Sequence, residues 1–428
     1  MHFSNVGSNP SVGFTDSSPC TGEPYEYYNV GAIHESPGTP GTESAKPNLS
    51  PHVPNTTTKG RIKMGKFSNL EPLELAELAC FTMMKKFDAQ KLPPEGHFHY
   101  HQGVFLSGFE QTYLNTGKKE YSDYIKKWVD SLIDEKGELV CEYNVNTLDD
   151  KQPAILMFRF LEETGDIKYE KAIKYIVSGI EDWPMTLEGG FWHTRQCKDQ
   201  MWLDGLYMAG ELLTRYGAKF DEDRFFELVH RQAKLMWDNI RDEETGLLYH
   251  AWDESRTAKW ADPQTGNAPE VWGRAAGWYI VALCTILKYM PSDCEYRADL
   301  ITYVQKYIEA FAKHQDAKTG LWYQVVDRGD DTNNWTETSC SALFLCGISM
   351  ALKAGYIDSS YRAVADKAYS GLADAMEDDG KGGVIMPRIC IGTGVGDYEF
   401  YLARPTSEND LHGMGALLLA CNAYHEIR

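Results

Sequence analysis

The sequence predicts an all-α protein with the architecture of an (α/α)6 barrel, in which six inner helices are wrapped by six outer helices. Two observations predict this fold. Helical segments alternate along the chain between an amphipathic type and a type that is apolar on every face. Each amphipathic segment is joined to the next apolar segment by a glycine turn. An open solenoid of helix pairs would use the same units, but with a more constant repeat length.

The amphipathic segments are predicted to be the outer helices, because each carries charged residues on one face. The first begins near Glu71 and has apolar residues at helical spacing, such as Leu78, Phe81 and Met84. The other five are residues 121–132, 169–180, 224–240, 296–312 and 361–376. Residues 1–65 are rich in Ser, Pro, Gly, Asn and Thr, so we expect a disordered arm or extension there and a barrel domain over residues 66–428.

The apolar segments are predicted to be the inner helices, buried nearly all round. They are residues 103–114, 152–163, 201–216, 274–289, 339–354 and 410–425. The turns before them contain a glycine followed by alternating apolar or aromatic residues, which predicts short β-ribbons at one rim: Gly96, Gly137, Gly190, Gly246, Gly320 and Gly383. Because the N-termini of the inner helices meet at this rim, we expect a site there that favours an anionic ligand.

Charge and hydropathy exclude several classes of partner. The chain has 42 Lys+Arg and 62 Asp+Glu, a net charge of −20, so we expect neither a nucleic acid nor an anionic membrane as partner. We also expect no membrane span and, because the N-terminus lacks a signal-like pattern, a cytoplasmic protein. Ten cysteines are scattered singly, which favours reduced thiols.

Three aspartates are candidates for catalysis. Asp149 and Asp150 follow one another just before Pro153, in the first turn of the second inner helix. One of them is expected to cap that helix, which leaves the other available for chemistry. Asp204 interrupts an apolar stretch of the third inner helix. If it does not belong to a buried cap network, a carboxyl group there is expected to be partly protonated near neutral pH, as general acid catalysis requires.

Arg274 and Trp278 are candidates for binding. They are four residues apart at the start of the fourth inner helix and so share a face, with small residues between them. An arginine in this position is suited to hold a carboxylate carried on a flat ring. The alternative is an arginine that pairs with a neighbouring carboxylate for structure alone.

Two further patterns are interpreted as structural. His97, His99 and His101 alternate, so a strand would place them on one face, but no Cys or carboxylate pattern completes a metal site. We therefore expect no metal. Residues 392–396 are rich in glycine, yet they lack the context of a phosphate-binding loop, and we expect them to form a close-approach loop at the barrel mouth.

Several motifs resemble those of one enzyme family. The segments MWLDGLYM at 201–208 and WGRAAGWY at 272–279, together with His250, resemble glycoside hydrolase family 105, the unsaturated rhamnogalacturonyl hydrolases. That family is related to the unsaturated glucuronyl hydrolases of family 88. The segments 161–166, 335–342 and 404–416 support the resemblance, which runs from about residue 70 to the C-terminus.

The resemblance implies a set of site residues. It implies the (α/α)6 barrel, Asp204 as general acid and base, and Asp149 as the second essential carboxylate, with Asp150 as the alternative for that role. It also implies five substrate contacts: His193, Trp202, His250, Arg274 and Trp278. Neither a metal nor a cofactor is implied, and the expected partner is a small oligosaccharide.

The resemblance also implies the chemistry. The enzyme would hydrate the C4=C5 double bond of an unsaturated galacturonyl residue in a lyase-derived rhamnogalacturonan disaccharide and release rhamnose. Three alternatives remain: an unsaturated glucuronyl hydrolase acting on other lyase products, an ordinary inverting glycosidase on the same barrel, and a sugar-binding protein without catalysis.

Overall fold

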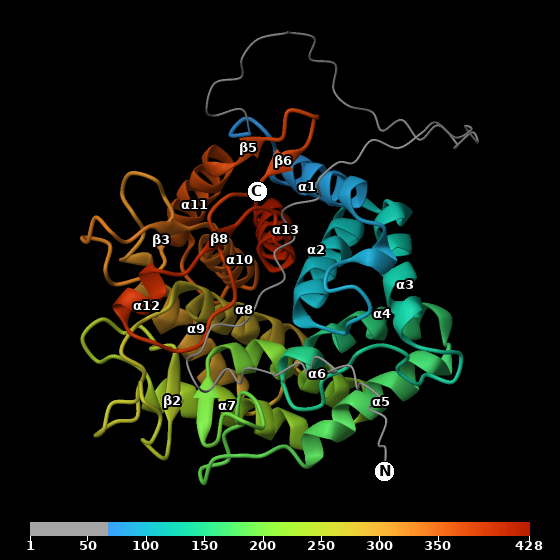
Figure 1. Cartoon of the computed structure of the whole chain (residues 1–428), viewed down its shortest axis with the longest axis horizontal. Helices are drawn as coiled ribbons and strands as arrows, with labels where there is room; N and C mark the ends of the chain where they lie inside the picture. Colours follow the sequence, from blue (N-terminus) through green and yellow to red (C-terminus); the bar gives the residue numbers. More distant parts are fainter. Residues whose placement is uncertain (1–66) are drawn as a thin grey trace, which may run out of the picture.

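The computed structural model describes residues 67–428, which form two concentric rings of helices (Figure 1). The outer helices are α1 (Pro72–Lys86), α3 (Lys119–Leu132), α5 (Ile167–Glu181), α7 (Arg224–Asn239), α9 (Arg297–Ala312) and α11 (Arg362–Ala375). The inner helices are α2 (Tyr100–Thr116), α4 (Ile155–Thr164), α6 (Asp204–Phe220), α8 (Gly273–Tyr289), α10 (Thr338–Lys353) and α13 (Leu411–His425). The alternation predicted from the sequence is therefore confirmed.

The ring of inner helices is closed. Helix α6 packs against α8, α8 against α10, and α10 against α13, while α4 lies between α2 and α6. The last inner helix, α13, then packs against the first, α2, and the two lie side by side in Figure 1. An open solenoid would leave these two helices apart. The contact between α2 and α13 thus decides the choice in favour of the (α/α)6 barrel.

The two rings differ in burial as their sequences predict. The outer helix α3 buries Tyr121, Ile125 and Trp128, which follow the helical period, and exposes charged residues on its other side. In contrast, the inner helix α10 is buried along nearly its whole length, from Thr338 to Ala351. Inner helices therefore form the core, and outer helices shield it from solvent.

Short antiparallel strand pairs lie at one rim, as predicted. They pair β1 (Gln200–Trp202) with β2 (Ala251–Asp253), β3 (Trp322–Tyr323) with β4 (Thr336–Glu337), β5 (Glu377–Asp378) with β6 (Val384–Ile385), and β7 (Ile389–Cys390) with β8 (Thr406–Ser407). The turn before β3 requires glycine: Gly320 has φ +77°, and a Cβ there would lie 2.4 Å from the carbonyl oxygen of Lys367.

Two inner helices begin later than predicted. Helix α6 begins at Asp204 because residues 200–202 pair as β1 with β2, so Asp204 lies in the first helical turn. Helix α4 is preceded by a 3₁₀ segment, η3 (Asp149–Ala154), which contains Pro153. Two other 3₁₀ segments, η2 (Ala89–Lys91) and η4 (Ser359–Tyr361), and the short helix α12 (Tyr398–Leu402) were not predicted.

Other predictions from the sequence have mixed outcomes. The arm predicted for residues 1–65 lies outside the described residues. Within residues 67–428, no helix combines the length and apolar character needed to cross a bilayer. Eight cysteines of residues 67–428 carry free thiols, as expected.

Candidate active site

A cavity of about 160 Å³ lies at the N-terminal ends of the inner helices. Its wall contains five of the seven residues that the sequence predicted for a site: Asp149, His193, Trp202, Asp204 and Arg274. They come from η3, the linker before β1, β1 itself, α6 and α8. The predicted mouth of the barrel is thus a concave site built from segments far apart in the sequence.

Asp204 is held by His250. The Asp204 carboxylate is 9% exposed, and its Oδ2 lies 3.2 Å from Nε2 of His250. His250 is completely buried in the linker before β2, and its Nδ1 lies 2.7 Å from the hydroxyl oxygen of Tyr401. His250 therefore reaches the site through Asp204, and Tyr401 fixes the orientation of its ring.

The pKa of Asp204 is lowered, which differs from the prediction. Burial raises this pKa, as the sequence argument assumed, but the hydrogen bond with His250 and the electrostatic interactions with His250 and His193 outweigh burial. The position of Asp204 in the first turn of α6 also favours a carboxylate. The expectation that Asp204 is itself partly protonated near neutral pH is therefore wrong for the free enzyme.

Asp149 has the opposite electrostatic environment. Burial and the charges of Asp150 and Asp204 raise its pKa well above the ordinary value, although a hydrogen bond with Thr147 acts against them. Its Oδ1 lies 3.8 Å from Nε2 of His193, across the cavity wall. Asp149 is thus the carboxyl group of this cavity that favours a proton.

Asp150 is directed away from the cavity. Its Oδ2 accepts a hydrogen bond of 2.6 Å from the backbone N–H of Asn144, and it does not line the cavity wall. Burial raises its pKa to about 7, against the effects of that hydrogen bond and of Lys151. The two adjacent aspartates therefore have different environments, and Asp149 is the one that faces the site.

His193 and Trp202 form one flat surface of the wall. Their rings are stacked, with centroids 4.4 Å apart and planes 6° apart. Burial lowers the pKa of His193 to about 4, against the charge of Asp204, so the imidazole is neutral at pH 7. The Trp202 ring also meets His250 edge to face at 5.4 Å. A stacked aromatic surface beside two carboxyl groups is suited to bind a sugar ring.

Arg274 is held by several contacts in the cavity wall. It is 1% exposed and lies over the ring of Trp272, with 4.7 Å between the guanidinium carbon and the ring centroid. It donates to the carbonyl oxygens of Cys390 and, at 2.9 Å, Ile391. Its Nη1 also lies 2.8 Å from Nε2 of His412. Arg274 therefore brings a rigid positive charge to the cavity.

Comparisons with known proteins identify the family and support the fold. A model of glycosyl hydrolase family 88 matches residues 75–427. The chain belongs to glycosyl hydrolase family 88. This family 88 protein is also similar to a glycoside hydrolase of family 105 from C. acetobutylicum ATCC 824, with 31% identity and a TM-score of 0.78. The match covers 82% of this chain and 98% of that one.

Two further proteins are similar to the family 88 protein. The unsaturated rhamnogalacturonyl hydrolase YesR of Bacillus subtilis (strain 168) is 28% identical over 302 residues, 68% of this chain and 79% of its own length. The unsaturated glucuronyl hydrolase of Bacillus sp. GL1 is 16% identical and has the same fold, with a TM-score of 0.59 over 81% of this chain and 95% of that one. The predicted family relationship, fold and hydrolase class are therefore confirmed.

Two predicted contacts of the family 88 protein, His250 and Trp278, do not line the cavity. Trp278 lies one turn further along α8 than Arg274 and is 1% exposed. Its ring packs against Tyr207, with centroids 4.4 Å apart, and it does not line the cavity wall. The helical spacing placed Trp278 on the correct face, but at a depth where it forms part of the core.

The cavity of the family 88 protein also contains residues that were not predicted as substrate contacts. His99 and Tyr100 at the start of α2, Trp272 before α8, and Thr393 in the glycine loop line the wall. The glycine loop is thus a close-approach loop at the mouth, as predicted. The sequence showed the alternating histidines and the glycine-rich segment, but gave no signal for the contact between His250 and Tyr401, which are 151 residues apart.

Proposed function

We propose that this hydrolase hydrates the C4=C5 double bond of an unsaturated galacturonyl residue at the non-reducing end of a lyase-derived rhamnogalacturonan disaccharide and releases rhamnose. The observation that carries the proposal is a pair of carboxyl groups with opposite pKa shifts, Asp149 and Asp204, in one cavity with Arg274. The relative YesR, an unsaturated rhamnogalacturonyl hydrolase, supports the choice of substrate.

The reaction begins with a proton transfer to C4. The double bond of an unsaturated uronide is part of a vinyl ether, so protonation at C4 places positive charge on C5 and the ring oxygen. Water then adds to C5 and loses a proton, which gives a hemiketal. The hemiketal opens and releases the next sugar. One proton is supplied and one is recovered, so the catalytic carboxyl groups return to their starting state.

Asp149 and Asp204 divide this work between them. The raised pKa of Asp149 keeps one proton on the pair in the free enzyme. This proton must pass to Asp204, at the start of α6 and against His250, before Asp204 donates it to C4. Asp204 then takes a proton from the attacking water, which restores the proton of the pair. Arg274 attracts the carboxylate of the substrate, while His193 and Trp202 contact its ring. No step requires a metal or a cofactor, and cytoplasmic location stays a prediction from the sequence.

The test is an assay of ultraviolet absorbance. Incubation with the unsaturated rhamnogalacturonan disaccharide is expected to remove the absorbance of the enol ether. Asp204→Asn is expected to lower kcat by about 10²–10⁴-fold, because proton transfer is lost while the shape of the side chain is kept. Asp299→Asn, on the outer helix α9, is the control and is expected to match the wild type.

The same assay separates the alternatives. An unsaturated glucuronyl disaccharide tests the preference for the sugar, and a saturated glycoside tests for an ordinary inverting glycosidase. Failure to convert any unsaturated uronide would overturn the proposal. If the Asp204→Asn variant keeps wild-type turnover, Asp204 is not the residue that exchanges protons with the substrate.

A further inference from the structure

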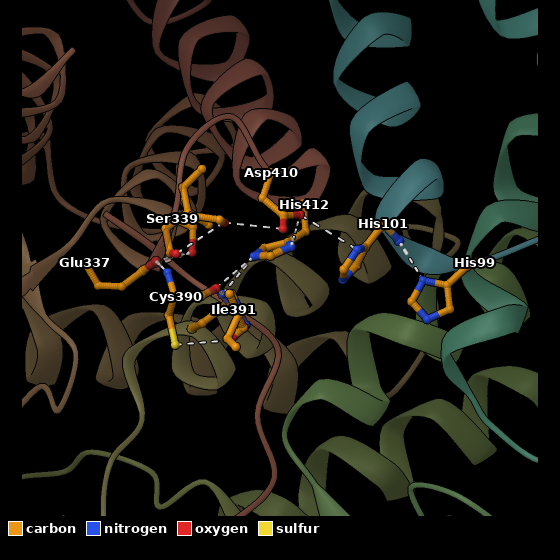
Figure 2. A network of polar contacts seen from close by, with 11 residues as sticks. His99, His101, Glu337, Ser339, Cys390, Ile391, Asp410 and His412 are labelled. Carbon is orange, nitrogen blue, oxygen red and sulfur yellow. Dashed lines mark hydrogen bonds and ion pairs between the residues drawn. The ribbon is translucent and has the colours of Figure 1, made fainter. Parts of the chain in front are cut away.

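A second group of polar residues lies behind Arg274. Asp410 and His412, at the start of α13, meet His101 of α2 where the barrel closes (Figure 2). Nδ1 of His412 lies 2.7 Å from Oδ1 of Asp410, and Nδ1 of His101 lies 3.8 Å from the same oxygen. His412 is completely buried, and its other ring nitrogen, Nε2, lies 2.8 Å from Nη1 of Arg274.

The contact with Arg274 fixes the tautomer of His412. Nε2 of His412 lies 2.8 Å from Nη1 of Arg274 and 3.2 Å from the carbonyl oxygen of Cys390. A guanidinium group has only donors, so the shorter contact requires Nε2 to accept from Arg274. The single ring proton is then on Nδ1, which faces Asp410. Although burial raises the pKa of Asp410, the electrostatic interaction and hydrogen bond with His412, the neighbouring His101 and the charge of Arg274 hold it well below the ordinary range. An ionised Asp410 therefore stabilises the one tautomer that can accept from Arg274.

We propose that Asp410 and His412 are positioning residues that hold Arg274 at the cavity wall for the carboxylate of the substrate. This inference rests on the proposed function, because it is the substrate that supplies the carboxylate. Without Asp410, the proton of His412 has no reason to stay on Nδ1. With the proton on Nε2, His412 would donate to the carbonyl oxygen of Cys390 and would present a donor to Arg274. Arg274 would then lose its contact with His412 and compete with it for that carbonyl oxygen.

The same group also resembles a metal site. His101, Asp410 and His412 each offer one possible ligand atom, and these three atoms lie within 4.8 Å of one another. Asp410 is the carboxylate that was missing from the pattern of alternating histidines. However, a histidine that binds a metal through Nδ1 carries its proton on Nε2. That proton would point at Arg274, and the metal would add positive charge beside a guanidinium group. The geometry thus favours a positioning role over a metal site.

Steady-state kinetics test the positioning role. His412→Ala is expected to raise KM for the unsaturated disaccharide by about 10–100-fold with little change in kcat, because a charge-assisted contact in the bound state is lost. His412→Gln, whose amide oxygen can accept from Arg274, is expected to recover most of the affinity. With the methyl ester of the substrate, which has no carboxylate, wild type and His412→Ala are expected to have similar KM values.

A control and a double-mutant cycle exclude a purely structural effect. His230 is a matched control, because its Nε2 lies 3.0 Å from Oδ2 of Asp299 on the outer helices. His230→Ala is expected to leave KM unchanged. The effects of His412→Ala and Arg274→Ala on KM are expected to be strongly non-additive. Additive effects, or an equal loss with the methyl ester, would overturn the proposal.

A measurement without turnover separates this inference from the proposed function. In ¹⁵N spectra of histidine-labelled protein, the signal of His412 is identified by its absence in the His412→Gln variant. In the wild type this signal is expected to show a proton on Nδ1 and none on Nε2. A proton on Nε2, or a stoichiometric divalent metal that is lost in His412→Ala, would overturn the positioning role even in an active enzyme. Absence of turnover with the expected tautomer would instead contradict the proposed function alone.

Discussion

At the scale of single residues, Asp149 and Asp204 show how neighbours reverse the effect of burial. Both carboxyl groups are desolvated, but Asp204 contacts His250, whereas Asp149 is near two other carboxylates. As a result, one proton stays on Asp149 at pH values where an isolated aspartate has lost it. This difference has consequences both for activity and for stability.

The first consequence is the alkaline limb of the pH–rate profile. Because the pKa of Asp149 is raised, kcat/KM is expected to fall as pH rises through that pKa and the proton of the pair is lost. Asp149→Asn is expected to remove this limb and to lower kcat by about 10²–10⁴-fold. The measurement is kcat/KM against pH for both proteins. If the alkaline limb persists in the variant, the limb reports the titration of another group.

The second consequence is a cost in folding stability. A raised folded-state pKa means that folding takes up a proton above the ordinary pKa, so stability decreases as pH rises from that value toward the raised one. Asp149→Asn removes the cost and is expected to increase the melting temperature at pH 7. At about pH 3, below the ordinary pKa of aspartate, the two proteins are expected to melt alike. Calorimetry at both pH values makes the comparison, and equal melting at pH 7 would contradict it.

At the scale of elements, local patterns were sufficient for the helices but not for their starts. The period of apolar residues in α3 and the full burial of α10 are properties of single segments, so the sequence predicted both rings. The start of α6 depends on pairing with β2, about 50 residues away, which no local pattern shows. The local motif was sufficient to predict Asp204 as a site residue. The electrostatic environment of Asp204 depends on residues distant in the sequence, and it was predicted incorrectly.

The candidate site follows the same division. The residues of local motifs, such as Asp204, His193 and Arg274, were predicted and line the cavity. Tyr401 and His412 act through partners that are 151 and 138 residues away, so only the fold brings them to the site. Trp278 was predicted as a substrate contact but lies in the core. Sequence spacing shows which face of a helix a residue occupies, whereas its distance from the cavity along the barrel axis is set by tertiary packing.

At the scale of the whole molecule, the seam between α2 and α13 depends on close backbone approach. A Cβ at Gly415 would lie 2.6 Å from the backbone carbon of Val104, and one at Gly108 would lie 2.5 Å from Cβ of Leu418. Neither neighbouring atom is the end of a flexible side chain. Glycine at these two positions therefore lets the last inner helix pack directly on the first.

Substitution at this seam is expected to destabilise the barrel. Gly415→Ala is expected to lower the free energy of unfolding by about 1–3 kcal/mol, because the helices must separate to admit a methyl group. Gly179→Ala in α5 is the control: its Cβ meets only Nζ of Lys151 at 3.6 Å, and the better helix propensity of alanine is expected to stabilise it by up to about 1 kcal/mol. Denaturant unfolding measures both, and equal effects would contradict the role of the seam.

The closure of the ring also has a consequence during synthesis. The cavity wall contains Tyr100 from the first inner helix, and its Arg274 contacts His412 on the last. A ribosome-bound chain that has not yet released α13 lacks both this contact and the packing of α13 on α2. Enzymatic turnover is therefore expected to require that α13 has been made and has docked on α2, so activity can serve as a reporter of ring closure in cells.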